Sequence, residues 1–212
     1  MPRTDNRLRV AEILLEIGAI RINLAEPIRF VSGILSPIYC DNRLLLGHPG
    51  ARSEVADALT EAVRSGSEPV DCVAGTATAG IPHAAWVADR LSLPMVYVRA
   101  QAKAHGKSKQ IEGGEVQERS VVVVEDLVTT GGSSLQTVNA LRDAGGRVER
   151  CVSIFSYGFR EADEAFTAAA CTSTSLCDFE ALLAASDTLD DAARAELLRW
   201  HADPHAWQPA EI

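Results

Sequence analysis

The hydrophobic and polar positions of this chain follow two different periods, and the change from one to the other marks its organisation. Apolar side chains recur three and four positions apart over residues 8–17 and 55–63, which predicts an amphipathic helix at each. Residues 19–24 instead alternate apolar with polar side chains, as a half-buried strand does. From residue 70 onward, short apolar runs alternate with helical patterns, which predicts βαβ units.

The βαβ region predicts an α/β fold with a mostly parallel central sheet flanked by helices. The expected strands are residues 70–74, 95–98, 121–124, 148–155 and a short one at 171–176. The expected helices are residues 80–90, 133–145, 161–170, 178–185 and 189–200. Ligands of such sheets bind beyond the carboxyl ends of the strands, so we expect the ligand-binding motifs to gather along one edge.

Residues 121–124 are four consecutive valines, which is typical of a strand buried on both faces. We expect this strand to break directly into Glu125 and Asp126, followed by the Thr/Gly loop 129–132 and a helix. Small residues before a helix let backbone N–H groups converge on an anion, and the helix dipole strengthens the site. The two carboxylates suit a neighbouring polyol or cation instead. The segment therefore predicts a site for a sugar phosphate.

Two further stretches suit phosphate chemistry. Residues 75–80, Gly-Thr-Ala-Thr-Ala-Gly, follow another expected strand, and their glycines permit a close approach of the backbone to a pyrophosphate. Residues 99–114 are the longest polar stretch and contain five potential cations. These are Arg99, Lys103, His105, Lys107 and Lys109. Taken alone, each stretch also fits a structural or solvated loop.

Composition narrows the possible classes. The 212 residues, 47% hydrophobic and 23% charged, suffice for one domain over residues 1–212. A net charge of −9 argues against a general nucleic-acid surface. Apolar runs stay far below about 18 residues and residues 1–5 lack a signal-peptide core, so we expect no membrane span and a cytoplasmic protein. The 5 scattered cysteines suit neither a metal site nor a disulfide framework.

Residues 121–133, VVVVEDLVTTGGS, resemble the phosphoribosyl-pyrophosphate motif of type I phosphoribosyltransferases. The resemblance implies the fold of that family, with a small hood subdomain built mainly from residues 19–46. It also implies that the two acids contact the ribose diol, that the Thr/Gly loop holds the 5′-phosphate, and that residues 75–80 are a pyrophosphate loop with unusual peptide geometry. The expected contacts are Glu125, Asp126, Val128, Thr129, Thr130, Gly131, Gly132, Ser133, Thr78 and Ala79.

Residues 32–43 resemble the hood of orotate phosphoribosyltransferases, and residues 30–43 predict two short strands about a Ser-Gly turn. In that family the hood covers the pyrimidine, which backbone groups near Tyr39 and Cys40 would read, with Thr129 as a further contact.

The carboxylate of orotate also needs a fixed cation. Arg43 offers a planar fork that accepts a carboxylate bidentately, although an intramolecular ion pair is its alternative role. Arg160 is the second candidate, because it follows a strand that ends in an orotate-binding arginine in some relatives.

The spacing R-x-x-x-K-x-H-G within residues 99–114 resembles the mobile catalytic loop of the same family. Arg99 and Lys103 are expected to neutralise the departing pyrophosphate, which stabilises the transition state more than the ground state. His105 is a possible proton donor or hydrogen-bond partner. Asp126 completes the expected catalytic set, because its negative charge stabilises the positive charge of the developing oxocarbenium. The resemblance also implies a homodimer whose loops are shared across the interface.

Lysines that many relatives carry are replaced by Val31 and Ala100, and a lysine of some relatives is replaced by Ala79. Either this protein makes fewer pyrophosphate contacts, or Lys107 and Lys109 partly compensate for the missing ones.

The function implied by these resemblances is the conversion of orotate and 5-phosphoribosyl 1-pyrophosphate to orotidine 5′-monophosphate and pyrophosphate in pyrimidine biosynthesis. Mg²⁺ is the expected cofactor, bound through phosphate oxygens and water with no ligand from protein side chains. One alternative is transfer to another nucleobase, which the hood disfavours. A second is a non-catalytic regulator that binds phosphoribosyl pyrophosphate, which Lys103 and His105 disfavour.

Overall fold

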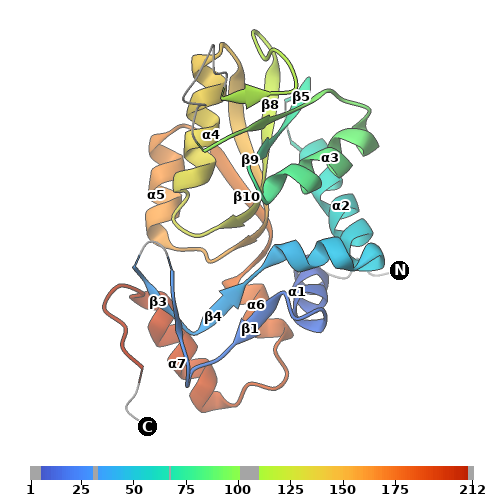
Figure 1. Cartoon of the computed structure of the whole chain (residues 1–212). Helices are drawn as coiled ribbons and strands as arrows, with labels where there is room; N and C mark the ends of the chain where they lie inside the picture. Colours follow the sequence, from blue (N-terminus) through green and yellow to red (C-terminus); the bar gives the residue numbers. More distant parts are fainter. Residues whose placement is uncertain (1–5, 31–32, 67, 101–109, 210–212) are drawn as a thin grey trace.

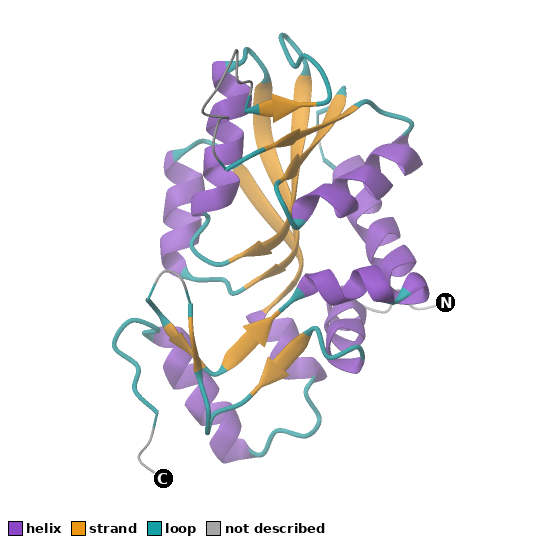
Figure 2. Cartoon of the chain, viewed as in Figure 1, coloured by secondary structure: helices purple, strands orange, loops and turns teal. Residues whose placement is uncertain are grey.

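The computed structural model describes residues 6–30, 33–66, 68–100 and 110–209. Its main feature is a six-stranded sheet with helices on both faces, and short hood strands lie beyond one end of it (Figure 1, Figure 2). The strands of the sheet, in spatial order, are β10 (Thr172–Asp178), β9 (Arg147–Ser156), β8 (Ser120–Val128), β5 (Cys72–Thr76), β6 (Met95–Val98) and β7 (Ile111–Glu112). All neighbours are parallel except β6 and β7, so the predicted mostly parallel α/β sheet is confirmed.

The valine run of β8 is buried on both faces of the sheet, as its sequence predicted. Val122 and Val124 belong to the core beneath α2 (Pro49–Arg64) and α3 (Gly80–Leu91). Val121 and Val123 belong to the opposite core, beneath α4 (Gly132–Asp143) and α5 (Arg160–Ala168). Successive strand residues point to opposite faces, so one run of valines anchors both helical layers.

The hood consists of two short antiparallel pairs. Strand β1 (Ile20–Ile22) pairs with β4 (Ile38–Cys40), and β2 (Ile28–Arg29) pairs with β3 (Leu35–Ser36). Strands β1, β3 and β4 lie within the ranges 19–24 and 30–43 in which hood strands were expected, whereas β2 begins earlier, at a position where no strand was predicted. A 3₁₀ helix, η1 (Asn42–Gly47), then leads into α2.

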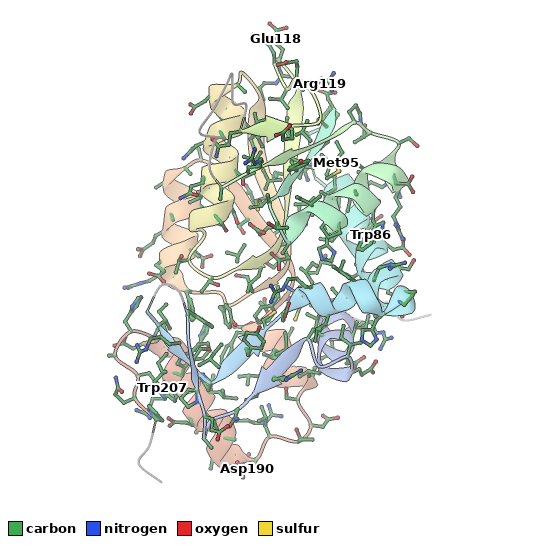
Figure 3. The ribbon with its side chains drawn as sticks, viewed as in Figure 1. Trp86, Met95, Glu118, Arg119, Asp190 and Trp207 are labelled. Carbon is green, nitrogen blue, oxygen red and sulfur yellow. The ribbon has the colours of Figure 1, made fainter. Side chains whose placement is uncertain are left out.

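The C-terminal helix supports the hood, although the two are far apart in sequence. Helix α7 (Asp191–Ala202) carries Trp200, whose fully buried ring donates a 2.9 Å hydrogen bond from Nε1 to the backbone oxygen of Leu35. Asp190 and Trp207, on either side of α7, lie at the hood end of the molecule, whereas Glu118 and Arg119 lie at the opposite end of the sheet (Figure 3). The remaining helices, α1 (Asn6–Glu16) and α6 (Phe179–Ala185), pack on each other.

The structure corrects several expected boundaries. Strand β8 does not end at residue 124 but continues through the two acids to Val128, because β9 runs beside it and pairs Leu127 with Phe155. Strand β7 and helix η1 were not predicted, since elements this short carry no periodic pattern. Among the described residues, no helix is long and apolar enough to cross a lipid bilayer.

Candidate active site

Two loops leave the sheet side by side at the carboxyl ends of β5 and β8. The strands are parallel neighbours, with Gly75 opposite Val124. Where the first loop enters α3, a Cβ added to Gly80 would lie 2.7 Å from the backbone oxygen of Val124 and 3.6 Å from Oε1 of Glu125. Only glycine allows this approach, so the start of α3 lies directly against Val124 and Glu125.

Glu125 is held inside the protein by the start of α4. Its side chain is only 3% exposed, and Oε2 accepts hydrogen bonds from Ser134 Oγ at 2.9 Å and Ser133 Oγ at 3.3 Å. Burial, and then the neighbouring charge of Asp126, raise the pKa of Glu125 to about 8. This carboxyl group therefore ties β8 to α4.

Asp126, the next residue, lies beside the hood, and its carboxyl group is also close to that of Glu125. Its side chain is half-buried, and burial raises its pKa, whereas the hydrogen bond with Glu125, backbone hydrogen bonds and, least, the positive charge of Arg43 act in the opposite direction. Its backbone oxygen accepts a 2.7 Å hydrogen bond from Nδ2 of Asn42, a fully buried residue of η1. The two adjacent acids thus have different surroundings, Glu125 among serines and Asp126 beside the hood.

The loop from β8 to α4 has the shape of an anion cradle. Thr129 and Thr130 are half-buried, whereas Gly132 and Ser133 are exposed at the first turn of the helix. Gly131 caps α4 with a φ of 82°, and a Cβ there would lie 3.0 Å from the ring of Phe166. Left-handed backbone and close packing both require glycine, and together they turn the chain so that the positive end of the helix dipole faces the loop.

The loop after β5 carries the other expected phosphate contacts. Thr78 is exposed and Ala79 is half-buried just before α3. The peptide between Ala77 and Thr78 is cis, in agreement with the unusual peptide geometry implied by the resemblance.

The hood residues expected to read the base lie on β4 and just after it. Tyr39 is 40% exposed, whereas the neighbouring Cys40 is buried. Arg43 is bound bidentately by Asp41, with Nε 2.6 Å from Oδ1 and Nη2 2.8 Å from Oδ2. The intramolecular ion pair considered for Arg43 is therefore present.

The remaining expected site residues are spread more widely. Arg99 follows β6, and its Nη1 lies 3.5 Å from Oε1 of Glu112 on β7. Arg160 begins α5, where its 91% exposed side chain pairs with Glu164 at 3.5 Å. Lys103 and His105 lie outside the described residues, as do Lys107, Lys109 and Val31. Ala100 is exposed at the end of the described segment.

Asn42 and Ser134 are site residues to which the sequence assigned no role. Asn42 lies inside the hood motif and Ser134 directly follows the phosphate motif, so each was adjacent to a recognised signal. Neither has a pattern of its own, because the partner of each is brought close only by folding.

Comparison with known proteins gives consistent matches. The sequence profile of the phosphoribosyl transferase domain matches residues 44–181. The orotate phosphoribosyltransferase of Coxiella burnetii is 46% identical over 203 residues, 94% of this chain and 97% of that protein. The orotate phosphoribosyltransferase of Bacillus caldolyticus is 48% identical over 201 residues, 93% of this chain and 97% of that protein. The crystal structure of orotate phosphoribosyltransferase from Aeropyrum pernix is similar with a TM-score of 0.73 and 33% identity, over 82% of this chain and 96% of that one.

Proposed function

The chain belongs to the orotate phosphoribosyltransferase family, and from this premise we propose that it transfers the phosphoribosyl group of 5-phosphoribosyl 1-pyrophosphate to orotate. The products are orotidine 5′-monophosphate and pyrophosphate, and the reaction belongs to pyrimidine biosynthesis. The family that the sequence resembles is therefore confirmed. The observation that carries the reaction is the position of Asp126, on the strand between the hood and the phosphate cradle.

The sugar phosphate fits along the end of β8. Backbone N–H groups and hydroxyls of residues 129–133 hold the 5′-phosphate at the start of α4, where the helix dipole favours an anion. Asp126 is the better placed of the two acids to accept hydrogen bonds from the ribose diol, because Glu125 is engaged by the serines of α4. The negative charge of Asp126 also stabilises the positive charge that develops on the ribose as the pyrophosphate leaves.

The pyrophosphate fits the loop after β5, where Thr78 and Ala79 precede the helix N-terminus of α3. Arg99 and Lys103 neutralise the charge that accumulates on the leaving group, and His105 donates a hydrogen bond or a proton to it. Closure of residues 99–114 over the site would exclude water, which otherwise hydrolyses the activated sugar.

Orotate fits beneath the hood, with Tyr39 and Cys40 on β4 and Thr129 at the start of the phosphate cradle. Its carboxylate requires a cation. Arg160 is the more accessible candidate. Its present partner is Glu164, and an exposed i,i+4 ion pair of this kind contributes little to stability. Arg43 would have to release Asp41, which now binds it bidentately, in order to bind the orotate carboxylate.

Mg²⁺ is part of the proposal as a companion of the substrate. The donors near the cradle are hard oxygens, namely the Asp126 carboxylate and threonine hydroxyls, and no group of three or more His, Cys, Asp or Glu side chains among the described residues could hold a metal. Such a donor set suits an ion carried by phosphate oxygens and water, which would neutralise the pyrophosphate.

The quaternary structure and location are also proposals. We expect a homodimer in which residues 99–114 of each subunit reach the partner's site. A cytoplasmic location is supported by the five cysteines, which are all buried and free.

The proposed reaction is tested by following orotate absorbance with purified protein, phosphoribosyl pyrophosphate and Mg²⁺. Loss of orotate absorbance that depends on both added reagents supports the proposal. Turnover of uracil or a purine without turnover of orotate would assign the protein to another base. Binding of phosphoribosyl pyrophosphate without turnover of any base would indicate a regulator.

A further inference from the structure

Asn42 connects the hood to the sugar-phosphate strand. It is the first residue of η1, separated from the hood strand β4 by Asp41 alone, and it is 0% exposed. Its Nδ2 donates a 2.7 Å hydrogen bond to the backbone oxygen of Asp126, 84 positions away in the sequence. The bond thus joins the segment that covers the base to the residue proposed to bind the ribose.

Both ends of the Asn42 side chain are engaged. Its Oδ1 lies 3.5 Å from Sγ of Cys40, the last residue of β4. A thiol is a weak donor, so most of the attachment comes from Nδ2, while the contact with Cys40 fixes the orientation of the amide. Leaving this neutral hydrogen bond unmade costs free energy, since the fully buried amide of Asn42 then loses its partner away from water.

At Asp126, strand β8 is paired with a neighbouring strand on one side only. Strand β5 pairs with β8 only as far as Val124, and Asp126 lies two residues beyond it. On the other side, β9 pairs with Glu125 and Leu127. A strand end held on one side has more freedom than a strand held on two, and the hydrogen bond from Asn42 adds a constraint at the backbone of Asp126.

We propose that Asn42 is a positioning residue of the site. By fixing the backbone of Asp126, it holds the Asp126 carboxylate in the orientation that accepts the ribose hydroxyls, and it places the hood over the base with the same bond. This inference rests on the proposed function, in which Asp126 binds ribose and residues 129–133 bind the 5′-phosphate.

The test compares two simple ligands by titration calorimetry. Ribose 5-phosphate requires both the Asp126 carboxylate and the cradle, whereas inorganic phosphate requires the cradle alone. Asn42→Leu has a similar volume and no hydrogen-bonding group. We expect it to weaken the binding of ribose 5-phosphate by about tenfold, the scale of one buried neutral hydrogen bond, and to change the binding of inorganic phosphate by less than about twofold. Asn42→Ser provides a second, smaller variant if the leucine does not fit.

Tyr157→Phe is the matched control. The hydroxyl of Tyr157 donates a 3.2 Å hydrogen bond to the backbone oxygen of Ile38, so this buried bond also attaches the sheet to the hood but does not touch Asp126. We expect Tyr157→Phe to bind both ligands as the unchanged protein does.

Four results would overturn the inference. They are unchanged binding of ribose 5-phosphate in a folded Asn42 variant, equal weakening by Tyr157→Phe, equal weakening of both ligands, and absence of ribose 5-phosphate binding by the unchanged protein. Orotate turnover is measured separately, so loss of the positioning role and loss of the proposed function give different outcomes.

Discussion

The hydroxyl of Ser134 donates a 2.9 Å hydrogen bond to Oε2 of Glu125, and both side chains are buried where β8 meets α4. This pair explains how an acidic side chain can continue a strand of buried valines. The hydroxyls of Ser133 and Ser134 satisfy one carboxyl oxygen, and the backbone N–H of Asp126 reaches the other at 3.1 Å. A buried carboxyl group with neutral donors still favours its protonated form.

Glu125 is therefore expected to make folding stability depend on pH. Its pKa is about 8 in the folded chain, against an ordinary value of 4.5 expected in the unfolded chain. The unfolded chain releases the proton first as the pH rises, so the stability associated with protonated Glu125 is complete below about pH 4.5 and is lost toward about pH 8. Glu125→Gln removes this titration and keeps an acceptor for Ser134. In urea unfolding, we compare the free energy of unfolding of Glu125→Gln with that of the unchanged protein. The difference should shift in favour of the variant by a few kcal/mol between about pH 4.5 and about pH 8, at about 1.4 kcal/mol per pKa unit. A difference that stays constant with pH would contradict this.

His83 should produce the opposite dependence. It is 1% exposed on α3, its Nε2 has no hydrogen-bond partner among the described residues, and burial lowers its pKa to about 4 from an ordinary 6.5. The neutral ring is compatible with folding above pH 6.5, and its contribution is lost as the pH falls toward about 4. His83→Phe keeps the edge contact with Trp86 but cannot become charged. Below pH 6.5, we expect the melting temperature of His83→Phe to fall less than that of the unchanged protein. A parallel fall of both melting temperatures would count against this.

Gly80 is predicted to be intolerant of any side chain. A Cβ there meets the backbone of Val124 at 2.7 Å, so Gly80→Ala must push the start of α3 away from β8. We expect lower thermal stability and weaker binding of phosphoribosyl pyrophosphate. Gly50→Ala is the matched control, because Gly50 also lies in the first turn of a helix and has no atom within 4 Å of an added Cβ. That variant should retain or slightly increase stability, since alanine favours helix more than glycine does. Equal behaviour of the two variants would refute the steric argument.

Lys103 tests the proposed catalytic loop. Lys103→Ala removes a cation from the departing pyrophosphate, so kcat should fall by about two orders of magnitude or more without a change in the melting temperature. Near-normal turnover would remove Lys103 from the mechanism.

A mixture of Lys103→Ala and Asp126→Asn subunits tests the proposed dimer. If loops cross the interface, some mixed dimers contain one intact site, and part of the activity should return after subunit exchange. Mixtures as inactive as the separate variants would contradict shared sites.

The partner of the orotate carboxylate can be identified by comparing Arg160→Ala with Arg43→Ala. Arg160 is exposed with a weak partner, whereas Arg43 is already bound bidentately by Asp41. We expect Arg160→Ala to raise the KM for orotate by about tenfold or more and to leave the KM for phosphoribosyl pyrophosphate nearly unchanged. The reverse pattern, with Arg43→Ala alone affecting orotate, would assign the role to Arg43.

Much of this protein could be predicted from local sequence. The valines before Glu125 and Asp126, the glycines of residues 129–132 and the alternation of strands with helices are all short-range patterns. Periodicity reports which side chains avoid water, and glycine reports where the backbone turns or approaches closely. These signals were sufficient for the parallel sheet, the family and the edge at which its motifs gather.

Only the tertiary structure decided how the two acids differ and what supports the hood. Glu125 and Asp126 are equivalent as sequence neighbours, yet one is buried against Ser134 and the other lies beside Asn42. Trp200 reaches Leu35 across 165 positions. Such contacts leave no periodic trace, because a single buried hydrogen bond between distant segments depends on where the whole chain places its two partners.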